Sequence, residues 1–289
     1  IGCAYGQGEQ RAVKSKKQQK LEERMPAFGS HTVQNTAFKS KSAGAIHRLD
    51  SLTYDEFVGT NMEAYDKETY YYDAAGNDTL TYWLELDGSG GWVTYYKNEQ
   101  TFNTSNQVTE SVEYYDNGNG LEEEEKVNNT YNTSGQLEQS ITSSWNGSSW
   151  DNSYRINYSY NNNGDLSNSI EEWNDAGTWV DSYKTDYTYD GSNKLASEVG
   201  YLWNGSQWDS SYYTLYTYTA TTQRSEEAYF DGTDWVIDYA QTITYDANGN
   251  AIEYLYEMWD GVAWEKDGRQ TMTYDLSVSL SDLFVPLWL

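Results

Sequence analysis

The sequence predicts an all-β fold, an antiparallel β-meander built from two-strand repeats of about 29 residues. Self-similarity at a fixed period in this range indicates a repeat architecture. The composition includes 29 Tyr, 12 Trp and only two Pro, which favours strands and turns over helices. Aromatic and polar residues alternate in the long segments, as in half-buried strands. The recurring aromatic positions are Tyr72, Phe102, Tyr131, Tyr160, Tyr189, Tyr218, Tyr245 and Tyr274.

The segment from Trp150 to Tyr160 shows how each long strand is predicted. Side chains alternate between the two faces of a strand, so Trp150, Tyr154 and Tyr160 are expected on one face, with Arg155 and Asn157 on the opposite one. An open twisted sheet rarely exceeds about ten strands without curling. We therefore expect the sheet to be curled or coiled so that the aromatic face is inward.

Two turn motifs separate the strands. The first, Tyr-[Asp/Asn]-x-x-[Gly/Asn], occurs at 160–164 and 245–249; its Asp or Asn opens a type I turn, and its Gly or Asn closes a hairpin with a bulge. The second, Trp-[Asn/Asp]-Gly-x-x-Trp, occurs at 145–150, 203–208 and 259–264. Short return strands are expected over Leu137–Trp145 and Leu195–Trp203.

The chain divides into four segments by composition. Residues 1–6 have the character of a signal-peptide remnant, and residues 7–46 of a flexible polar leader. An alternative is that Ile1-Gly2-Cys3 ends a lipobox with Cys3 lipidated; both interpretations predict export. The β-repeat array spans 47–276 in about eight units. Residues 277–289 are interpreted as the start of a truncated C-terminal segment.

Charge and residue usage exclude several classes of function. Residues 1–48 hold nine Lys/Arg and three Asp/Glu, whereas residues 49–289 hold nine and 42. An acidic array repels nucleic acid and anionic lipid. The two histidines, His31 and His47, precede the repeats, so they offer no catalytic triad or histidine zinc site within them. No apolar run is long enough for a transmembrane helix.

The turns carry a resemblance to known repeat families. Tyr-Asp-x-x-Gly-Asn at 72–77 and 245–250 resembles the YD repeats of RHS-type proteins. The longer unit, with Trp145–Trp150 and Trp203–Trp208, is similar to repeats of secreted Bacteroidetes proteins that bear a type IX sorting domain. The resemblance covers roughly 48–285 and implies a location outside the cytoplasm of a Gram-negative bacterium, either secreted or on the outer cell surface. It implies no specific activity.

Two sets of residues are candidate binding sites. Rows of tryptophan suit stacking against sugar rings, although they equally suit a core that is short of aliphatic residues. A charged break in the repeats, Glu123, Glu125 and Asp116, is a candidate calcium site, because two carboxylates on one face need a cation, a basic partner or water; a solvated, degenerate repeat is the alternative. Asp246 to Asn250 is instead interpreted as a turn, since its glycine stands fourth rather than sixth. The candidate ligand-binding tryptophans are Trp150, Trp179, Trp208, Trp235 and Trp264.

A basic ladder follows the tryptophan positions. Five residues after each lies a basic residue in six of the eight copies. Pairing with acids of the return strands is expected, and an anion-binding stripe is the alternative. The acids proposed as partners are Glu138, Glu171, Glu198 and Glu253. The ladder consists of Lys67, Lys97, Lys126, Arg155, Lys184 and Arg269.

The sequence favours a non-catalytic scaffold or adhesive role over enzymatic activity. Repeats give each copy the same acids, whereas a catalytic site needs one distinct constellation. An extracellular glycan-binding module is the alternative, and a glycosidase is the weakest reading. Expected partners are surface glycans or other surface proteins, with no cofactor other than calcium.

Overall fold

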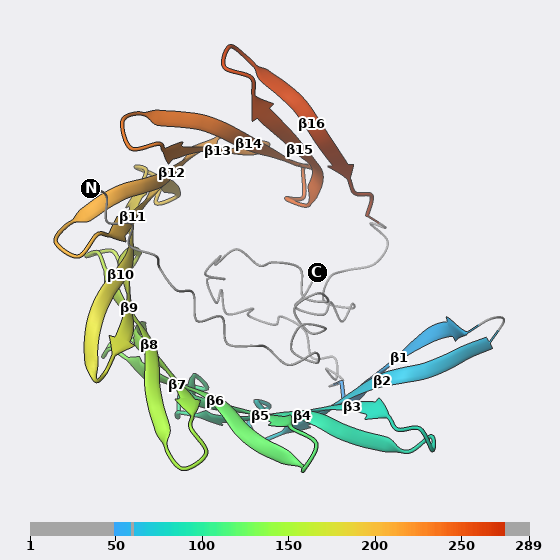
Figure 1. Cartoon of the computed structure of the whole chain (residues 1–289). Helices are drawn as coiled ribbons and strands as arrows, with labels where there is room; N and C mark the ends of the chain where they lie inside the picture. Colours follow the sequence, from blue (N-terminus) through green and yellow to red (C-terminus); the bar gives the residue numbers. More distant parts are fainter. Residues whose placement is uncertain (1–48, 59–60, 275–289) are drawn as a thin grey trace, which may run out of the picture. The chain divides into compact units, whose positions relative to one another are not determined.

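The computed structural model describes residues 49–58 and 61–274, and every regular element within them is a β-strand. Sixteen strands form one sheet in chain order, each antiparallel to the next, which confirms the predicted meander (Figure 1). No described segment is a helix able to cross a membrane. The expectations for 1–6, 7–46 and 277–289, including lipidation of Cys3, lie outside the described residues.

Long and return strands alternate along the sheet. The predicted long strand Trp150–Tyr160 and the return strands Leu137–Trp145 and Leu195–Trp203 are found to the residue. The long strands are β2 (Asn61–Tyr72), β4 (Trp92–Phe102), β6 (Leu121–Tyr131), β8 (Trp150–Tyr160), β10 (Thr178–Tyr189), β12 (Trp208–Tyr218), β14 (Trp235–Tyr245) and β16 (Trp264–Thr271). The return strands are β1 (Ser51–Val58), β3 (Asp78–Leu86), β5 (Val108–Asp116), β7 (Leu137–Trp145), β9 (Leu166–Asp175), β11 (Leu195–Trp203), β13 (Thr222–Phe230) and β15 (Ala251–Trp259).

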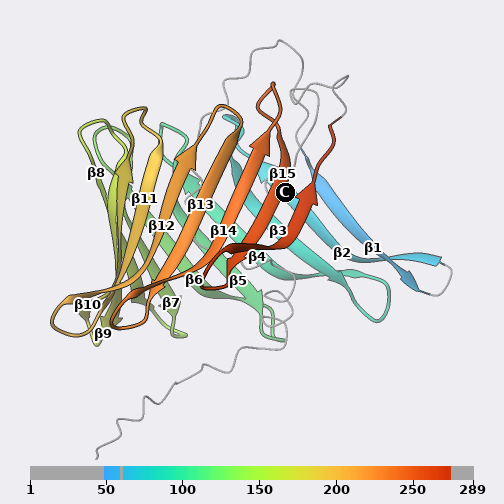
Figure 2. The same cartoon turned by 90° about the horizontal axis from the view of Figure 1, so that it is seen from above.

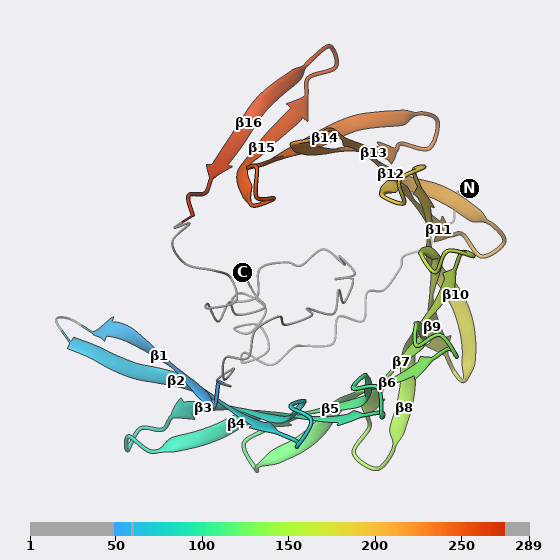
Figure 3. The ribbon, with the colours of Figure 1, turned by 180° about the vertical axis from the view of Figure 1, so that it is seen from behind.

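The sheet curls progressively along its strand order, as predicted for so many strands (Figures 1 and 3). Consecutive strands lie side by side throughout (Figure 2). Among the described strands, β1 pairs only with β2 and β16 only with β15. The sheet therefore has two edges rather than a closed circuit of strands.

Both turn motifs form the predicted hairpins. In the turn after β8, Oδ1 of Asn161 accepts hydrogen bonds from the backbone N–H of Asn163 (2.9 Å) and of Asp165 (3.0 Å). Gly164 takes a φ of 88°, and the strand register shifts next to the turn; this is the expected bulged hairpin. Gly147 has a φ of 92° at the tryptophan turn, a backbone conformation that glycine tolerates best.

A second bulge, which the sequence analysis missed, lies three residues after each tryptophan position. In β8, Asn152 pairs with Ser143 and Tyr154 with Thr142, so Ser153 is the extra residue. A bulge reverses the alternation of side chains beyond it. The same shift occurs in all eight long strands; the extra residues are Tyr65, Tyr95, Glu124, Ser153, Ser182, Ser211, Asp238 and Asp267.

The predicted single aromatic face is therefore wrong. Residues paired across strands point to the same face, so Trp150, opposite Trp145, shares its face with Arg155, opposite Ile141. Tyr154 and Tyr160 lie on the other face. We call the face of Trp150 and Arg155 the tryptophan face, and the face of Tyr154 and Tyr160 the tyrosine face.

Side chains on both faces are mostly half-buried. Among the described residues, the buried apolar side chains are Tyr96, Ala228 and Ala240. The sheet accordingly has no thick apolar core, and its packing consists of side-chain rows that run across the strands on each face.

Candidate functional site

Paired aromatic rings close the tryptophan end of the hairpins. The ring centroids of Trp145 and Trp150 are 5.2 Å apart, as are those of Trp203 and Trp208. The same separation recurs at the last hairpin, between Trp259 and Trp264. At the hairpin between β13 and β14, Phe230 takes the partner's place, 5.3 Å from Trp235. The turn motif thus produces a contact between its own two ends, on the tryptophan face.

Two side chains of the basic ladder lie over the tryptophan of the following repeat. The Nζ of Lys126 is 4.8 Å from the ring centroid of Trp150, and the guanidinium of Arg155 is 4.5 Å from that of Trp179. Cation–π contacts at such distances stabilise by ~0.5–1 kcal/mol at exposed sites. The bulge makes these contacts possible, because without it the cation and the tryptophan would lie on opposite faces.

Arg155 also forms the best-defined ion pair on this face. Its Nε donates to Glu172 at 2.7 Å and its Nη2 at 2.6 Å, a bidentate pair in which the Glu172 side chain is 10% exposed. Asn157 donates to the same carboxylate. Bidentate, charge-assisted hydrogen bonds fix geometry as well as adding stability.

Four residues of the ladder pair with acids, but mostly not with the predicted ones. Lys97 binds Glu99 (3.0 Å) and Lys184 binds Asp186 (2.7 Å), each two residues along its own strand. Of the proposed acids, Glu253 lies 3.9 Å from Arg269. Glu171 and Glu198 instead accept hydrogen bonds from tyrosine hydroxyls on the tyrosine face, because the bulge reverses the predicted faces.

The ion pair with Lys97 lowers the pKa of its partner, Glu99. Burial alone would raise the pKa of Glu99, but hydrogen bonds from Lys97 and Tyr114 outweigh it and hold that pKa below its ordinary value. The Nζ of Lys97 also lies 3.4 Å from the Tyr114 ring centroid. The carboxylate is thus kept charged, and the lysine is committed to internal contacts.

Arg224 compensates for the repeat whose ladder position is alanine. Ala240 lies in β14 and is fully buried. Arg224, in the preceding strand, reaches across β14, and its Nη1 donates to Glu257 at 2.5 Å. Its guanidinium lies 5.0 Å from the ring centroid of Trp264. A cation therefore lies over this tryptophan although the ladder position itself is neutral.

The tyrosine face is organised around a glycine in the middle of a strand. Tyr183 and Tyr212 stack at 6.2 Å with an interplanar angle of 9°. They come from β10 and β12, and Gly200 of the intervening β11 pairs with Tyr212. A Cβ built on Gly200 would collide with both tyrosines. No repeat signal in the sequence marks this glycine.

The three acids proposed for calcium do not converge. Glu124 is the bulge residue, so Glu123, opposite Tyr114, and Glu125, opposite Glu113, lie on different faces. Oδ1 of Asp116 accepts the backbone N–H groups of Gly118 and Gly120 and shapes the turn. Within residues 49–58 and 61–274, no group of three His, Cys, Asp or Glu side chains is arranged to hold a metal ion.

Acids do gather at this break, on the tyrosine face. Burial, followed by the charge of Glu125, raises the pKa of Glu113, and burial followed by the charge of Glu124 raises that of Glu125. Tyr96 and Tyr115 form the aromatic contact beside them, at 4.9 Å. The cluster is a place of electrostatic strain rather than a ligand set.

The Asp246 turn uses its carboxylate internally. Its Oδ1 accepts the backbone N–H of Asn248 (2.8 Å) and of Asn250 (2.9 Å), while its Oδ2 accepts the Asn250 side chain. These bonds hold the pKa of Asp246 below its ordinary value, with the side-chain bond as the largest contribution. The turn interpretation is confirmed.

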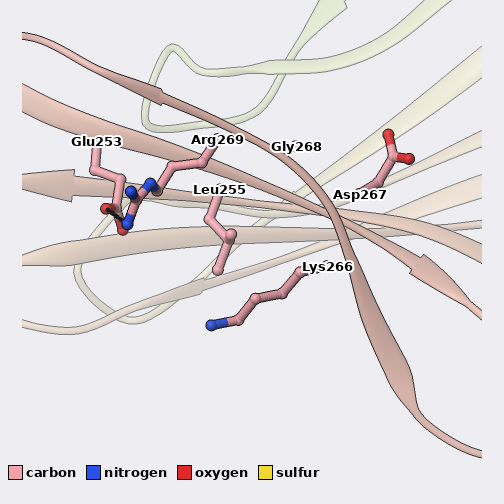
Figure 4. A pocket seen from close by; sticks show the side chains of 6 residues that line it. All are labelled: Glu253, Leu255, Lys266, Asp267, Gly268 and Arg269. Carbon is pink, nitrogen blue, oxygen red and sulfur yellow. Dashed lines mark ion pairs between the residues drawn. The ribbon is translucent and has the colours of Figure 1, made fainter.

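A shallow hollow lies at the β15–β16 edge of the sheet. Glu253, Leu255, Lys266 and Arg269 lie along it with Asp267 and Gly268 (Figure 4). Glu253 and Arg269 form an ion pair there, which leaves the Lys266 ammonium apart from them in this view. The hollow is open, and its other charged side chains, Lys266 and Asp267, do not converge on this ion pair.

The most exposed tryptophan among the described residues was not one of the candidates. Trp173 is 56% exposed and lies on the tyrosine face, where it contacts Tyr154 at 4.6 Å and donates its indole N–H to Ser182 at 2.8 Å. Of the five candidates, Trp235 is 38% exposed and the other four are half-buried. Trp173 stands third from the end of its return strand, where the repeat shows no tryptophan, so periodicity gave no signal for it.

Comparisons with known proteins give no family. No family model matches the sequence, and no curated protein matches it. A Bacteroides fragilis protein of unknown function is 16% identical, with a TM-score of 0.37 over 40% of this chain and 91% of its own. A DUF3836 family protein from Bacteroides vulgatus is 17% identical, with a TM-score of 0.26 over 28% and 89%. The TcdB2–TccC3 structure gives 12% identity and a TM-score of 0.34 over 74% of this chain and 13% of its own. These scores indicate only remote likeness, so the fold is defined by the strand register of this chain itself.

Proposed function

We propose that this chain is a non-catalytic repeat protein with a scaffold or adhesive role, secreted or held at the outer surface of a Gram-negative bacterium. The observation that carries the proposal is that equivalent polar groups make the same internal contacts repeat after repeat. The hydroxyls of Tyr131, Tyr160, Tyr189 and Tyr218, for example, each donate to the backbone carbonyl 23 residues earlier. Side chains committed in this way build a surface rather than a reaction centre.

The shape of the repeat also favours a surface role. A repeat array contacts only its neighbours and extends by adding units, which produces a long exposed surface. The acidic charge of residues 49–289 supports proteins or neutral glycans as partners and opposes nucleic acid. The likeness of its turns to YD repeats and to the repeats of type IX-secreted Bacteroidetes proteins supports export.

A glycan-binding module is the second candidate, and the exposure of Trp173 and Trp235 favours it. An exposed indole presents an apolar ring that suits stacking against a sugar. Against it, the rings of Trp150, Trp179 and Trp264 are already contacted by Lys126, Arg155 and Arg224. Any glycan site would therefore use the exposed indoles and not the row as a whole.

Location and adhesion are tested in the producing bacterium. Antibody should label intact cells or the culture medium, and a deletion strain should attach less to its surfaces; label confined to lysed cells would contradict the proposal. A glycan array separates the two candidates. Binding that is abolished by Trp173→Ala or Trp235→Ala, with the Trp150→Ala control retained, would favour the glycan module.

A further inference from the structure

The two edge strands of the sheet, β1 and β16, are of different kinds. Every long strand from β2 to β14 is followed by a return strand that pairs with it. β16 is a long strand whose second edge has no partner among the described strands, and β1 is a return strand whose first edge has none. Among these strands, the edge at β16 lacks a return strand, and β1 is a return strand. The edge at β1 lacks a long strand, and β16 is a long strand.

The repeat register can be carried across these two edges. Arg269 stands five residues after Trp264, as Arg155 stands five residues after Trp150. Asp55 pairs with Ala64, two residues after Met62, as Glu172 pairs with Asp181, two residues after Trp179. An added β1 strand in the register of β9 against β8 would therefore place Asp55 opposite Arg269, as Glu172 is opposite Arg155. The pairs that follow are Gln270 with Tyr54, Thr271 with Thr53, and Met272 with Leu52.

Charge at the edges fits this register. Arg155 and Glu172 form a bidentate ion pair within the sheet, with Nη2–Oε1 at 2.6 Å. By contrast, Arg269 has a side chain that is 65% exposed and approaches Glu253 only to 3.9 Å, and Asp55 is exposed. The edges thus present the two halves of an ion pair that is complete elsewhere in the array.

We propose that copies of this chain associate end to end, with β16 of one copy adding to β1 of the next in the antiparallel register of β8 and β9. Strand addition satisfies edge N–H and C=O groups. The partner is a second copy, because β1 and β16 of one chain do not pair with each other. A head-to-tail contact of this kind generates rings or filaments. The inference does not depend on the proposed function.

The experiment measures mass against concentration for the full chain by sedimentation or light scattering. The wild type should grow in mass as concentration rises. Arg269→Glu alone and Asp55→Arg alone each place like charges opposite each other, and each should raise the concentration at half-association about tenfold, equivalent to about 1.4 kcal/mol. An equimolar mixture of the two variants should regain association, because every joint between unlike copies is again complementary.

Controls separate this joint from general charge effects. Arg269→Lys should retain association, and Lys194→Glu, an equal charge reversal away from both edges, should leave it unchanged. A chain that stays monomeric at every concentration would overturn the proposal. So would association that both reversals leave intact, or a mixture that associates no better than either variant alone.

Discussion

The hydroxyl of Tyr160 donates a hydrogen bond of 2.7 Å to the backbone carbonyl of Leu137, the first residue of the preceding return strand. The bond joins the neighbouring strands β7 and β8 and ties the end of the long strand to the start of the return strand paired with it. Burial accordingly raises the pKa of Tyr160. The same bond joins Tyr189 to Leu166 and Tyr218 to Leu195, so it acts as a lock between successive repeats.

Removal of this lock should destabilise the array locally. Tyr160→Phe leaves the Leu137 carbonyl without its partner, and we expect a loss of ~1 kcal/mol in unfolding free energy. The natural Phe102 provides the matched reverse change, since Phe102→Tyr can reach Asp78, the first residue of β3, and should stabilise. Denaturant titration measures both. Equal effects of the same sign would contradict the lock.

Gly200 should not tolerate a side chain. An added Cβ would collide with the rings of Tyr183 and Tyr212, whose stacking depends on the absence of one. We expect Gly200→Ala to cost ~1–3 kcal/mol, although alanine normally improves a strand. Gly191→Ala is the control, because a Cβ there meets nothing within 4 Å. Thermal melting that ranks the two variants the other way would refute this account.

Ala240 should be intolerant of the basic residue that its repeat position otherwise favours. Arg224 crosses β14 to reach Glu257, and Ala240 is fully buried in that strand. Ala240→Lys should therefore displace Arg224 and destabilise by ~1–3 kcal/mol. The same substitution with Arg224→Ala should recover part of the loss. If the two changes are strictly additive in chemical denaturation, the two side chains do not share this space.

The acids beside Tyr96 should give a distinctive pH dependence. The folded-state pKa values of Glu113 and Glu125 are raised, first by burial. A raised carboxyl pKa means that the folded state binds protons more readily, so this region gains stability as pH falls from neutral through the raised values toward the ordinary 4.5. Glu125→Gln should stabilise the chain at pH 7.5 and reduce the gain on acidification. Melting temperatures that change equally with pH in both proteins would contradict the assignment.

The sequence predicted most of the fold because period and turn chemistry are local signals. The tyrosine turns and the limits of β8 follow directly from Trp150, Tyr160 and Asn161. The bulge did not follow, because its residues range from Ser153 to Glu124 and share no side-chain property. Because the bulge was not predicted, the residues beyond it were assigned to the wrong face. The proposed partner acids Glu171 and Glu198 were wrong for the same reason.

The candidate site was less predictable than the fold. The sequence predicted the rows of tryptophan. It did not predict which tryptophan rings are contacted by cations, because that depends on the face on which each cation lies, and the bulge sets the face. The acids Glu123 and Glu125 were separated for the same reason. Trp173 escaped notice because its exposure follows from its place near the end of a return strand, where no repeat signal marks it.

The central claim is that the bulge places the ladder cation Arg155 over Trp179 of the next repeat. A double-mutant cycle of Arg155→Ala and Trp179→Ala, measured by chemical denaturation, tests it most directly. The account predicts a favourable coupling of ~0.5–1 kcal/mol between the two side chains, since their separation is 4.5 Å. A coupling indistinguishable from zero would show that Arg155 does not lie over Trp179, as expected for a strand whose alternation is unbroken, and the claim would be wrong.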